Sequence, residues 1–255
     1  MTIQFCSDLH LEFEESRRFL QENPIIPLGD ILVIAGDAIY LGNPEMAAYP
    51  FFDWCADHFA ETLIVPGNHE FYGGFDIADT LEDFELPLRP NVRYLNNKSW
   101  RKDDVELFFT TMWPHYSPVD KLNAQMMMND YEYGVYGGKR FEAFDVNGIH
   151  KRCTDWLAGA LDASDARTKV VVTHHCPIIE SEKVRYLGKW ASPCYMTDMT
   201  AFMEAHRPAF WIHGHVHFIR SYGVGVGPTT VHSNPLGYVF DEEASAFNNE
   251  MTIEL

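Results

Sequence analysis

The sequence Ile-Leu-Val-Ile-Ala-Gly-Asp at residues 31–37 decides the fold class, because an unbroken aliphatic run leads directly into Gly36 and Asp37. A short apolar run without alternation is typical of a strand that is buried on both faces. Glycine lets the chain turn sharply after the strand. Similar runs predict further strands at residues 3–5, 62–65, 105–109, 170–172 and 210–212.

Helical patterns lie between several of these predicted strands. One apolar face extends over residues 149–161, and a second over 199–206 with Thr197 as its candidate N-cap. Strands that alternate with helices indicate an α/β protein. After residue 217 the glycine-rich sequence to residue 233 predicts antiparallel strands, as a second sheet or an extension. We find no internal repeat or linker, so we expect a single domain over residues 1–255.

Five predicted strands run into Asp, Asn or His side chains. Ligands in open α/β sheets bind beyond the carboxyl ends of the strands, so we expect these side chains to meet in one crevice. Their oxygen and imidazole donors, without a thiolate, suit Mn, Fe, Zn, Ni or Co. The residues concerned are Asp8 and His10, Asp37, Asn68 and His69, His174 and His175, and His215 and His217.

The spacing of these donors favours two ions. In an extended chain residues i and i+2 point to the same face, so Asp8 and His10 can bind one ion together, and His215 and His217 can do the same. The whole set exceeds what one ion needs but fits two ions that share a carboxylate, for which Asp37 is the natural bridge. Glycine before a ligand lets the backbone approach the ions or a phosphate closely. Such glycines are Gly36, Gly67 and Gly214.

Five short motifs stand in a fixed order along the chain. They are D-x-H at residues 8–10, G-D at 36–37, G-N-H-E at 67–70, H-H at 174–175 and G-H-x-H at 214–217. Together they resemble the calcineurin-like metallophosphoesterase superfamily over most of the chain. The resemblance implies a four-layer αββα sandwich of two mixed β-sheets flanked by helices, two metal ions and hydrolysis of phosphate esters.

The resemblance also implies a ligand set for each ion, with the bridging carboxylate in both sets. The two sets are Asp8, His10, Asp37 and His217, and Asp37, Asn68, His174 and His215.

Two histidine assignments need comment. His174 and His175 both align with the strand-end ligand of the family, and we favour His174 because it comes first off the strand. The resemblance places His69 beside the leaving group, as general acid or transition-state stabiliser. Together with two of the metal ligands, Asp37 and Asn68, His69 is expected to be a catalytic residue.

Several neighbouring residues are expected to be structural. Glu70 is expected to orient a histidine or cap the following helix. His213 is expected to be a buried, hydrogen-bonded histidine, and Cys176 a small buried filler. Core or rim packing is the expected role of the remaining candidates, Tyr72, Tyr131, Tyr195 and residues 126–128.

Composition excludes several classes of protein. The formal charge of -18 repels polyphosphate backbones, so we do not expect a nucleic acid polymer as partner. The first residues lack a signal-peptide pattern and no apolar run is long enough to span a membrane, so we expect a cytoplasmic protein without a membrane partner. Five scattered cysteines indicate reduced thiols rather than a disulfide framework.

The leading hypothesis is a hydrolase of small phosphate esters that uses two divalent transition-metal ions and a metal-bridging hydroxide as nucleophile. One alternative is a scaffold or binding protein that keeps the fold without hydrolysis. Another is a nuclease of the same superfamily, which needs a basic track that the charge of -18 disfavours.

The sequence does not indicate the substrate, because specificity is carried by loops. It also leaves open the preference for monoesters or diesters, the native metal and the oligomeric state.

Overall fold

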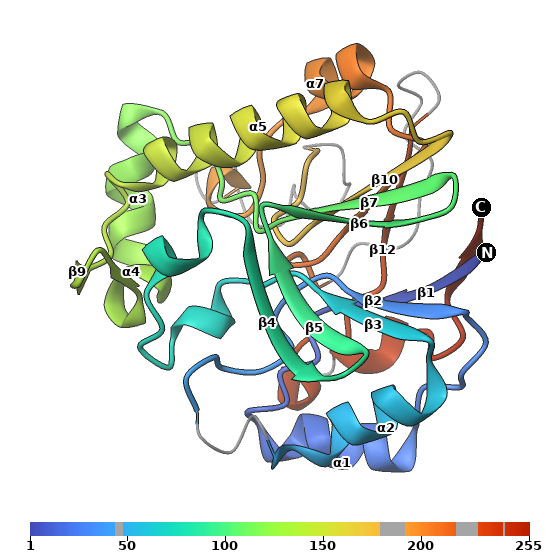
Figure 1. The fold of residues 1–255 in the computed structure, drawn as a ribbon. Coiled ribbons are helices and arrows are strands. Elements are labelled where there is room, and N and C mark those ends of the chain that lie inside the picture. The colour runs from blue at the N-terminus through green and yellow to red at the C-terminus, as the bar shows by residue number, and fades with distance from the viewer. Residues whose placement is uncertain (44–47, 179–191, 218–228, 242) are drawn as a thin grey trace.

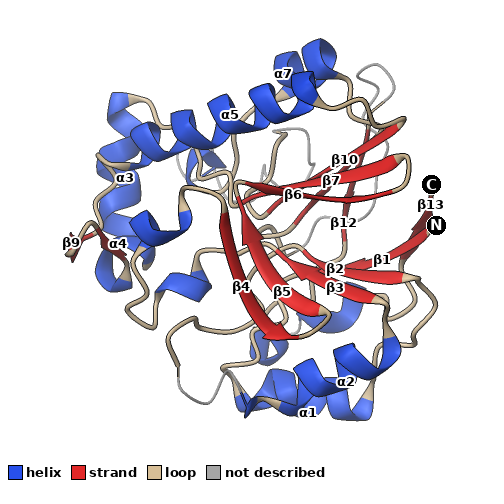
Figure 2. Cartoon of the chain, in the orientation of Figure 1, coloured by secondary structure: helices blue, strands red, loops and turns tan. Residues whose placement is uncertain are grey.

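The computed structural model describes residues 1–43, 48–178, 192–217, 229–241 and 243–255. Two β-sheets face each other in the middle of the molecule, and helices cover their outer faces (Figure 1 and Figure 2). The expected four-layer αββα sandwich is therefore confirmed.

The first sheet has the strand order β13-β1-β2-β3-β5-β4. The four inner strands are parallel, whereas β13 and β4 run antiparallel to their neighbours at the two edges. The strand bounds are β1 (Thr2–Cys6), β2 (Ile31–Ile34), β3 (Glu61–Ile64), β4 (Phe84–Arg89), β5 (Val92–Asn96) and β13 (Thr252–Glu254).

The second sheet has the order β12-β11-β10-β7-β6, and only β6 is antiparallel to its neighbour among these described strands. Its strand bounds are β6 (Lys98–Lys102), β7 (Val105–Thr110), β10 (Thr168–Thr173), β11 (Phe210–His213) and β12 (Thr230–Ser233). A short hairpin of β8 (Val135–Tyr136) and β9 (Lys139–Arg140) lies apart from both sheets.

The prediction of antiparallel strands after residue 217 is wrong for β12. This strand pairs with β11 in parallel, with Phe210 opposite Thr230. The connection over residues 214–229 exceeds the dozen residues that a parallel crossover requires. The part of that prediction that falls on residues 218–228 lies outside the described residues.

Alternate residues of the central strands face different layers. In β2, Ile31 and Val33 belong to the core between the sheets, whereas Leu32 and Ile34 pack in the cluster beneath the helices. Each strand is thus buried on both faces, which is why the apolar runs show no alternation.

The helices form the outer layers. In Figure 1, α1 (Glu14–Glu22) and α2 (Pro50–His58) lie below the first sheet, and α5 (Val146–Ala163) and α7 (Thr200–His206) above the second. On the left lie α3 (Pro118–Met127) and α4 (Asp130–Tyr133). The short 3-10 turns are η2 (His69–Phe71), η3 (Ile77–Thr80), η4 (Ser192–Cys194), η5 (Val239–Asp241) and η6 (Glu243–Ala246).

Two details of the helices test the sequence prediction. The predicted face of α5 is confirmed, since Ile149, Cys153 and Leu157 are fully buried. Thr197 is not the N-cap of α7, because the cap position is Met199 and the N–H of Thr200 instead donates to the side chain of Asp198. An acidic side chain two residues earlier therefore satisfies this free backbone donor.

Candidate metal centre

The loops that follow β1, β2, β3, β10 and β11 meet between the carboxyl ends of the two sheets. The backbone joins them directly: the N–H of Asp8 donates to the carbonyl of Gly36, and the N–H of Gly214 to the carbonyl of His174. Candidate ligands from these loops form three groups whose ligand atoms lie within 4.8 Å of one another. The groups are Asp8, His10 and His217, called here the His10 cluster; Asp37, His174 and His215, called the His174 cluster; and His10, Asp37 and His69.

Asp37 stands between the two clusters. Its Oδ2 lies 3.4 Å from Nε2 of His174 and 3.9 Å from Nε2 of His10, and its Oδ1 accepts a hydrogen bond from the N–H of His69. Burial opposes ionisation, but His174 and His69 outweigh it and hold the pKa of Asp37 well below its usual range. A buried carboxylate with this position is suited to bridge two cations.

The His10 cluster brings two imidazole rings close together. Nε2 of His10 lies 3.4 Å from Nε2 of His217, which in turn lies 3.3 Å from Oδ1 of Asp8. On the far side of the rings, Nδ1 of His10 contacts Glu12 at 3.1 Å and Nδ1 of His217 contacts Glu243 at 2.5 Å. A carboxylate at Nδ1 accepts a hydrogen bond from Nδ1–H and so keeps the proton on that nitrogen, which leaves the lone pair of a neutral imidazole on Nε2.

The backbone of the His10 cluster differs from the extended chain expected for D-x-H. Asp8 and His10 have φ values of 54° and 46°, in the left-handed region. The chain turns there because the N–H of His10 donates to the carbonyl of Asp37 in the neighbouring loop. The two side chains still meet, but the turn rather than strand alternation brings them together. His215 and His217 do not form one group with each other, since they belong to different clusters.

The His174 cluster also directs ring nitrogens inward. Nδ1 of His174 donates to the carbonyl of Ala35 at 2.9 Å, and its Nε2 lies 3.0 Å from Oδ1 of Asn68. The amide nitrogen of Asn68 donates to Oδ1 of Asp130 and to the hydroxyl of Tyr72, each at 2.9 Å. These bonds turn the amide oxygen of Asn68 toward the cluster, where it can bind a cation.

His175 points elsewhere. Its Nδ1 lies 3.3 Å from the carbonyl of Thr111, and its ring packs 5.1 Å from that of Trp113. Burial lowers the pKa of His175 to about 3. The structure thus brings His174 and not His175 into the cluster around Asp37, although the ring of His175 lies 4.4 Å from that of His215.

The side chains of both clusters fit a cation. Nε2 of His10 and Nε2 of His217 lie 3.4 Å apart, close enough for both atoms to bind one cation when the two rings are neutral. Nε2 of His215 is buried and has no hydrogen-bond partner among the described residues. Burial opposes a charge on His217, yet its hydrogen bonds to Asp8 and Glu243 raise its pKa to about 10. Burial instead lowers the pKa of His10 and of His215, which favours their neutral, metal-binding form. The oxygen and nitrogen donors of the centre suit a divalent transition metal.

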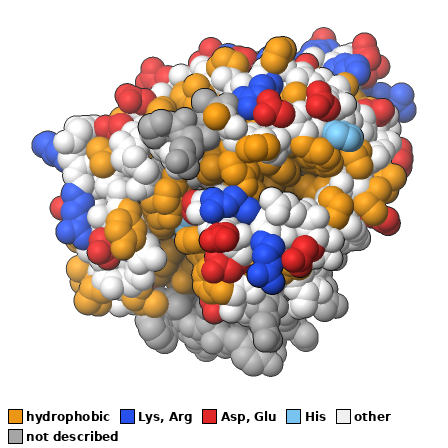
Figure 3. All heavy atoms as spheres, turned by 90° about the horizontal axis from the view of Figure 1, so that it is seen from below, with side chains coloured by type: hydrophobic (Ala, Val, Ile, Leu, Met, Phe, Trp, Pro, Cys, Tyr) orange, Lys and Arg blue, Asp and Glu red, His pale blue; other side chains and the backbone are white. Residues whose placement is uncertain are grey.

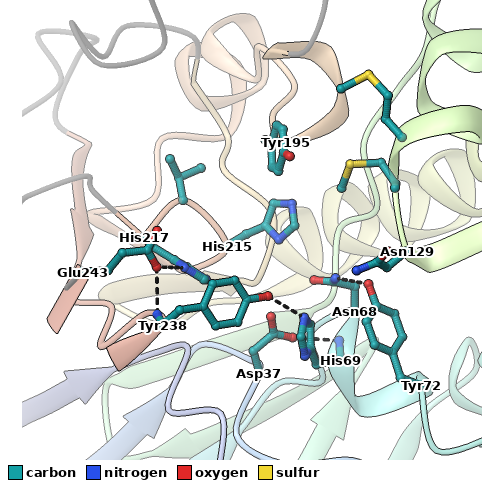
Figure 4. A pocket seen from close by; sticks show the side chains of 13 residues that line it. Asp37, Asn68, His69, Tyr72, Asn129, Tyr195, His215, His217, Tyr238 and Glu243 are labelled. Atoms are coloured by element: carbon teal, nitrogen blue, oxygen red, sulfur yellow. Dashed lines mark hydrogen bonds and ion pairs between the residues drawn. The ribbon is translucent and has the colours of Figure 1, made fainter. Parts of the chain in front are cut away.

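His69 is held from both sides. Its Nδ1 lies 2.9 Å from Oε1 of Glu12, and its Nε2 lies 3.0 Å from the hydroxyl of Tyr238 (Figure 4). Burial lowers the tendency to protonate, but Asp37 and Glu12 outweigh it and raise the pKa of His69. The ring is thus suited to carry and donate a proton near neutral pH.

Gly67 allows the backbone to come very close to the carboxylate of Asp37. A Cβ at this position would lie 2.1 Å from Oδ1 of Asp37, which no side chain permits. Because the backbone comes this close, the N–H of His69 can donate to Oδ1 of Asp37, the carboxylate between the two clusters.

Glu70 is neither a histidine partner nor a helix cap. Its carboxylate accepts hydrogen bonds from the backbone N–H groups of Asp37, Ala38 and Gly67, and from the hydroxyl of Tyr94. Glu70 is fully buried, so it ties together the two loops that carry the central ligands. His213 is buried with Nδ1 2.9 Å from the carbonyl of Gly214, as expected. All five cysteines are buried, and none of them forms a disulfide in the described part of the chain.

A cavity of about 300 Å³ opens over the centre and contacts Asp37, Asn68 and His69. Figure 4 shows Tyr195, Tyr72 and Tyr238 around it. Contrary to expectation, Tyr72 and Tyr195 line the cavity rather than only pack. Met127 and Met128 also line it, because α3 ends at the cavity. Tyr131 is buried in the core as expected.

Four partners of the candidate ligands are absent from the sequence prediction. Glu12 had a usable signal, since it continues the D-x-H spacing by two residues. The others had none, because they are far from their partners in the chain. They are Asp130, Tyr238 and Glu243.

A second hollow, of about 600 Å³, lies between α1 and α2 and is lined by residues including Leu20, Phe51 and Trp54. Figure 3 looks at this side of the molecule, where hydrophobic side chains lie next to charged ones. None of the described residues that line it belongs to the clusters, so it is separate from the candidate centre.

The sequence profile of the calcineurin-like phosphoesterases matches residues 1–218, which contain every candidate ligand. The chain belongs to this family. Proteins of this family typically bind divalent metals, and the His and Asp clusters of this chain could hold such ions.

Other known proteins are similar over nearly the whole chain. An uncharacterized protein, L509, of Acanthamoeba polyphaga mimivirus is 25% identical over 282 residues, which cover 99% of this chain and 96% of its own. The structure of phosphopantetheinyl hydrolase from Mycobacterium tuberculosis superposes with a TM-score of 0.63 at 14% identity, over 96% of this chain and 92% of that one. The protein TT1561 of Thermus thermophilus gives 0.50 at 11% identity, over 92% and 88%. These two structures share the fold.

Among the helices that the structure describes, none is both long and apolar enough to cross a membrane.

Proposed function

We propose that this phosphoesterase hydrolyses small phosphate esters with two divalent metal ions. The His10 cluster would hold one ion, the His174 cluster together with Asn68 would hold the other, and Asp37 would contribute to both sites. The observation that carries the proposal is the position of Asp37, whose Oδ2 lies within 3.9 Å of a ring nitrogen from each cluster.

Two such ions, of Mn, Fe, Zn, Ni or Co, would lower the pKa of a bound water so that hydroxide is available as nucleophile near neutral pH, and would offset the charge of the phosphate. The side chains of the protein do the remaining work. His69 in its protonated form donates a proton from Nε2 to the leaving oxygen, because Nδ1 is hydrogen-bonded to Glu12 and Nε2 faces the hydroxyl of Tyr238 beside the cavity. Asn68 is fixed by Asp130 and so presents its oxygen without rearrangement.

The substrate we propose is small. A cavity of about 300 Å³ is at the lower end of the range for ligand pockets. Its described lining residues include no Lys or Arg, so the ions rather than side chains would balance the phosphate charge there. The net charge of -18 disfavours a nucleic acid polymer, and with it the nuclease alternative.

A metal titration and a hydrolysis panel test the proposal. The purified chain would be loaded with Mn²⁺ and assayed on p-nitrophenyl phosphate, bis-p-nitrophenyl phosphate, cyclic nucleotides and a phosphopantetheinyl ester, which separates monoester from diester preference. Metal-dependent hydrolysis of at least one substrate is the expected result. Metal binding without hydrolysis of any of them would favour the non-catalytic scaffold, and no metal binding at all would overturn the proposal.

A further inference from the structure

One carboxylate oxygen serves two histidines from different parts of the site. Oε1 of Glu12 lies 2.9 Å from Nδ1 of His69 and 3.1 Å from Nδ1 of His10. The two rings lie 4.4 Å apart and are inclined at 66°, so both reach the same oxygen without stacking. The Glu12 side chain is 6% exposed and does not line the cavity, so it acts only through its partners.

The other carboxylate oxygen of Glu12 indicates that this side chain is present for its contacts with the two histidines rather than for stability. Oε2 is buried and has no hydrogen-bond partner among the described residues. A buried carboxylate oxygen without a protein partner contributes less to the stability of the fold than a fully hydrogen-bonded one. A side chain selected only for stability would avoid this cost, so the contacts of Oε1 are the better explanation for a carboxylate at this position.

The segment around Glu12 is itself fixed. Nη1 of Arg17, in α1, donates to the backbone carbonyls of Leu11 and Glu12 at 3.1 and 3.4 Å. The first turn of α1 thus holds the backbone from which Glu12 reaches the two rings.

Fixing Nδ1 determines what Nε2 can do in each ring. A carboxylate at Nδ1 holds the proton there and turns Nε2 toward the centre. In His10 this atom faces His217 at 3.4 Å, and in His69 it faces the hydroxyl of Tyr238 at 3.0 Å beside the cavity. The same oxygen therefore prepares one ring to bind a cation and the other to meet the substrate.

We propose that Glu12 is a positioning residue that sets the tautomer and orientation of His10 and His69 together through one shared oxygen. The inference rests on the proposed function for the roles of the two histidines, but not for the contacts themselves. Glu12→Gln removes the charge and lets an amide N–H face Nδ1, which favours the opposite tautomer. Glu15→Gln, an exposed glutamate at the start of α1, is the matched control.

Nitrogen-15 NMR of the full chain with labelled histidine provides the first readout, and it requires neither metal nor activity. His10→Gln and His69→Gln variants identify the two rings by loss of signal. We expect a protonated Nδ1 in both rings of the wild type and of Glu15→Gln, and loss of that state in both rings of Glu12→Gln. If Glu12→Gln does not fold, Glu12→Asp is too short to reach both rings, and at least one should lose the Nδ1 proton.

Zinc affinity, measured by competition with a chelator, is the second readout. Glu12→Gln should weaken one of the two sites by about 10- to 100-fold, and Glu15→Gln neither. Unchanged tautomers and unchanged zinc affinity in a folded Glu12→Gln protein would overturn the inference and reduce Glu12 to a structural residue. Failure of the proposed function looks different: the wild type would then bind no zinc, while the NMR comparison would still report on Glu12.

Discussion

Oε2 of Glu70 accepts a hydrogen bond from the backbone N–H of Asp37 at 2.9 Å, although the two residues lie on loops after different strands. The same oxygen accepts from the N–H of Gly67 at 2.7 Å, and Oε1 accepts from Ala38 at 2.7 Å. One buried carboxylate thus aligns the loop after β2 with the loop after β3. Both ligands that we assign to these loops, Asp37 and Asn68, depend on that alignment.

Glu70→Ala should therefore destabilise the fold as well as the site. It leaves three buried N–H groups without a partner, each worth about 1–3 kcal/mol, so we expect the free energy of unfolding to fall by at least about 3 kcal/mol. Urea denaturation of the metal-free chain measures this, with the exposed Glu204→Ala as control. Equal stability of the two variants would show that water or a shifted backbone replaces Glu70.

Asp37→Ala should reduce metal content. The wild type is expected to hold about two ions per chain after Mn²⁺ loading, because two clusters share one carboxylate. Removing the shared carboxylate weakens both sites. Elemental analysis after gel filtration gives the ratio, with the exposed Asp57→Ala in α2 as control. A wild-type ratio of zero, or an unchanged ratio in Asp37→Ala, would contradict the dinuclear proposal.

The paired histidines should behave differently. Nε2 of His174 lies 3.0 Å from Asn68 and 3.4 Å from Asp37, so His174→Ala is expected to lose metal at one site and to lose activity with it. His175→Ala should keep both ions and show a smaller defect, because that ring packs against Trp113. Metal content and kcat are measured on the same preparations. The reverse order would transfer the ligand role to His175.

The loss of activity in His69→Ala should depend on the leaving group of the substrate, because we propose His69 as the proton donor. The ring has one nitrogen facing Tyr238 beside the cavity and one held by Glu12. General acid catalysis is worth about 10²- to 10⁴-fold, and an alkoxide needs the proton far more than a nitrophenolate does. We expect both ions to be retained and kcat/KM to fall much further on an alkyl ester than on the p-nitrophenyl ester.

The two substrates of that experiment control for each other, because damage to the fold slows both equally. Equal losses would indicate electrostatic stabilisation or positioning by His69 instead of proton donation. Loss of metal from this variant would make His69 a ligand, as its group with His10 and Asp37 permits.

Most of the central strands were predictable because their signal is local. A run such as residues 31–34 is apolar at every position since both of its faces are covered, and such a run can be recognised without any knowledge of its neighbours. The strands β4, β6 and β13 escaped prediction, and so did the inner strand β5, whose apolar residues are interrupted by Arg93. The first three are the outermost strands of their sheets, and β4 and β6 carry Pro87 and a Lys- and Arg-rich sequence at residues 98–102, which are typical of exposed edges.

By itself the sequence determined which side chains end most of the central strands and in what order, and hence an α/β fold and the chemistry of the donors at Asp8, His10 and Asp37. These features depend on residues close together in the chain, whereas the αββα sandwich was implied only by the resemblance of five motifs to the family. The tertiary structure alone decided how the donors divide into two clusters, that β12 is parallel to β11, and that Glu243 supports His217. These contacts join loops that only the packing of two sheets brings together, so no local pattern encodes them.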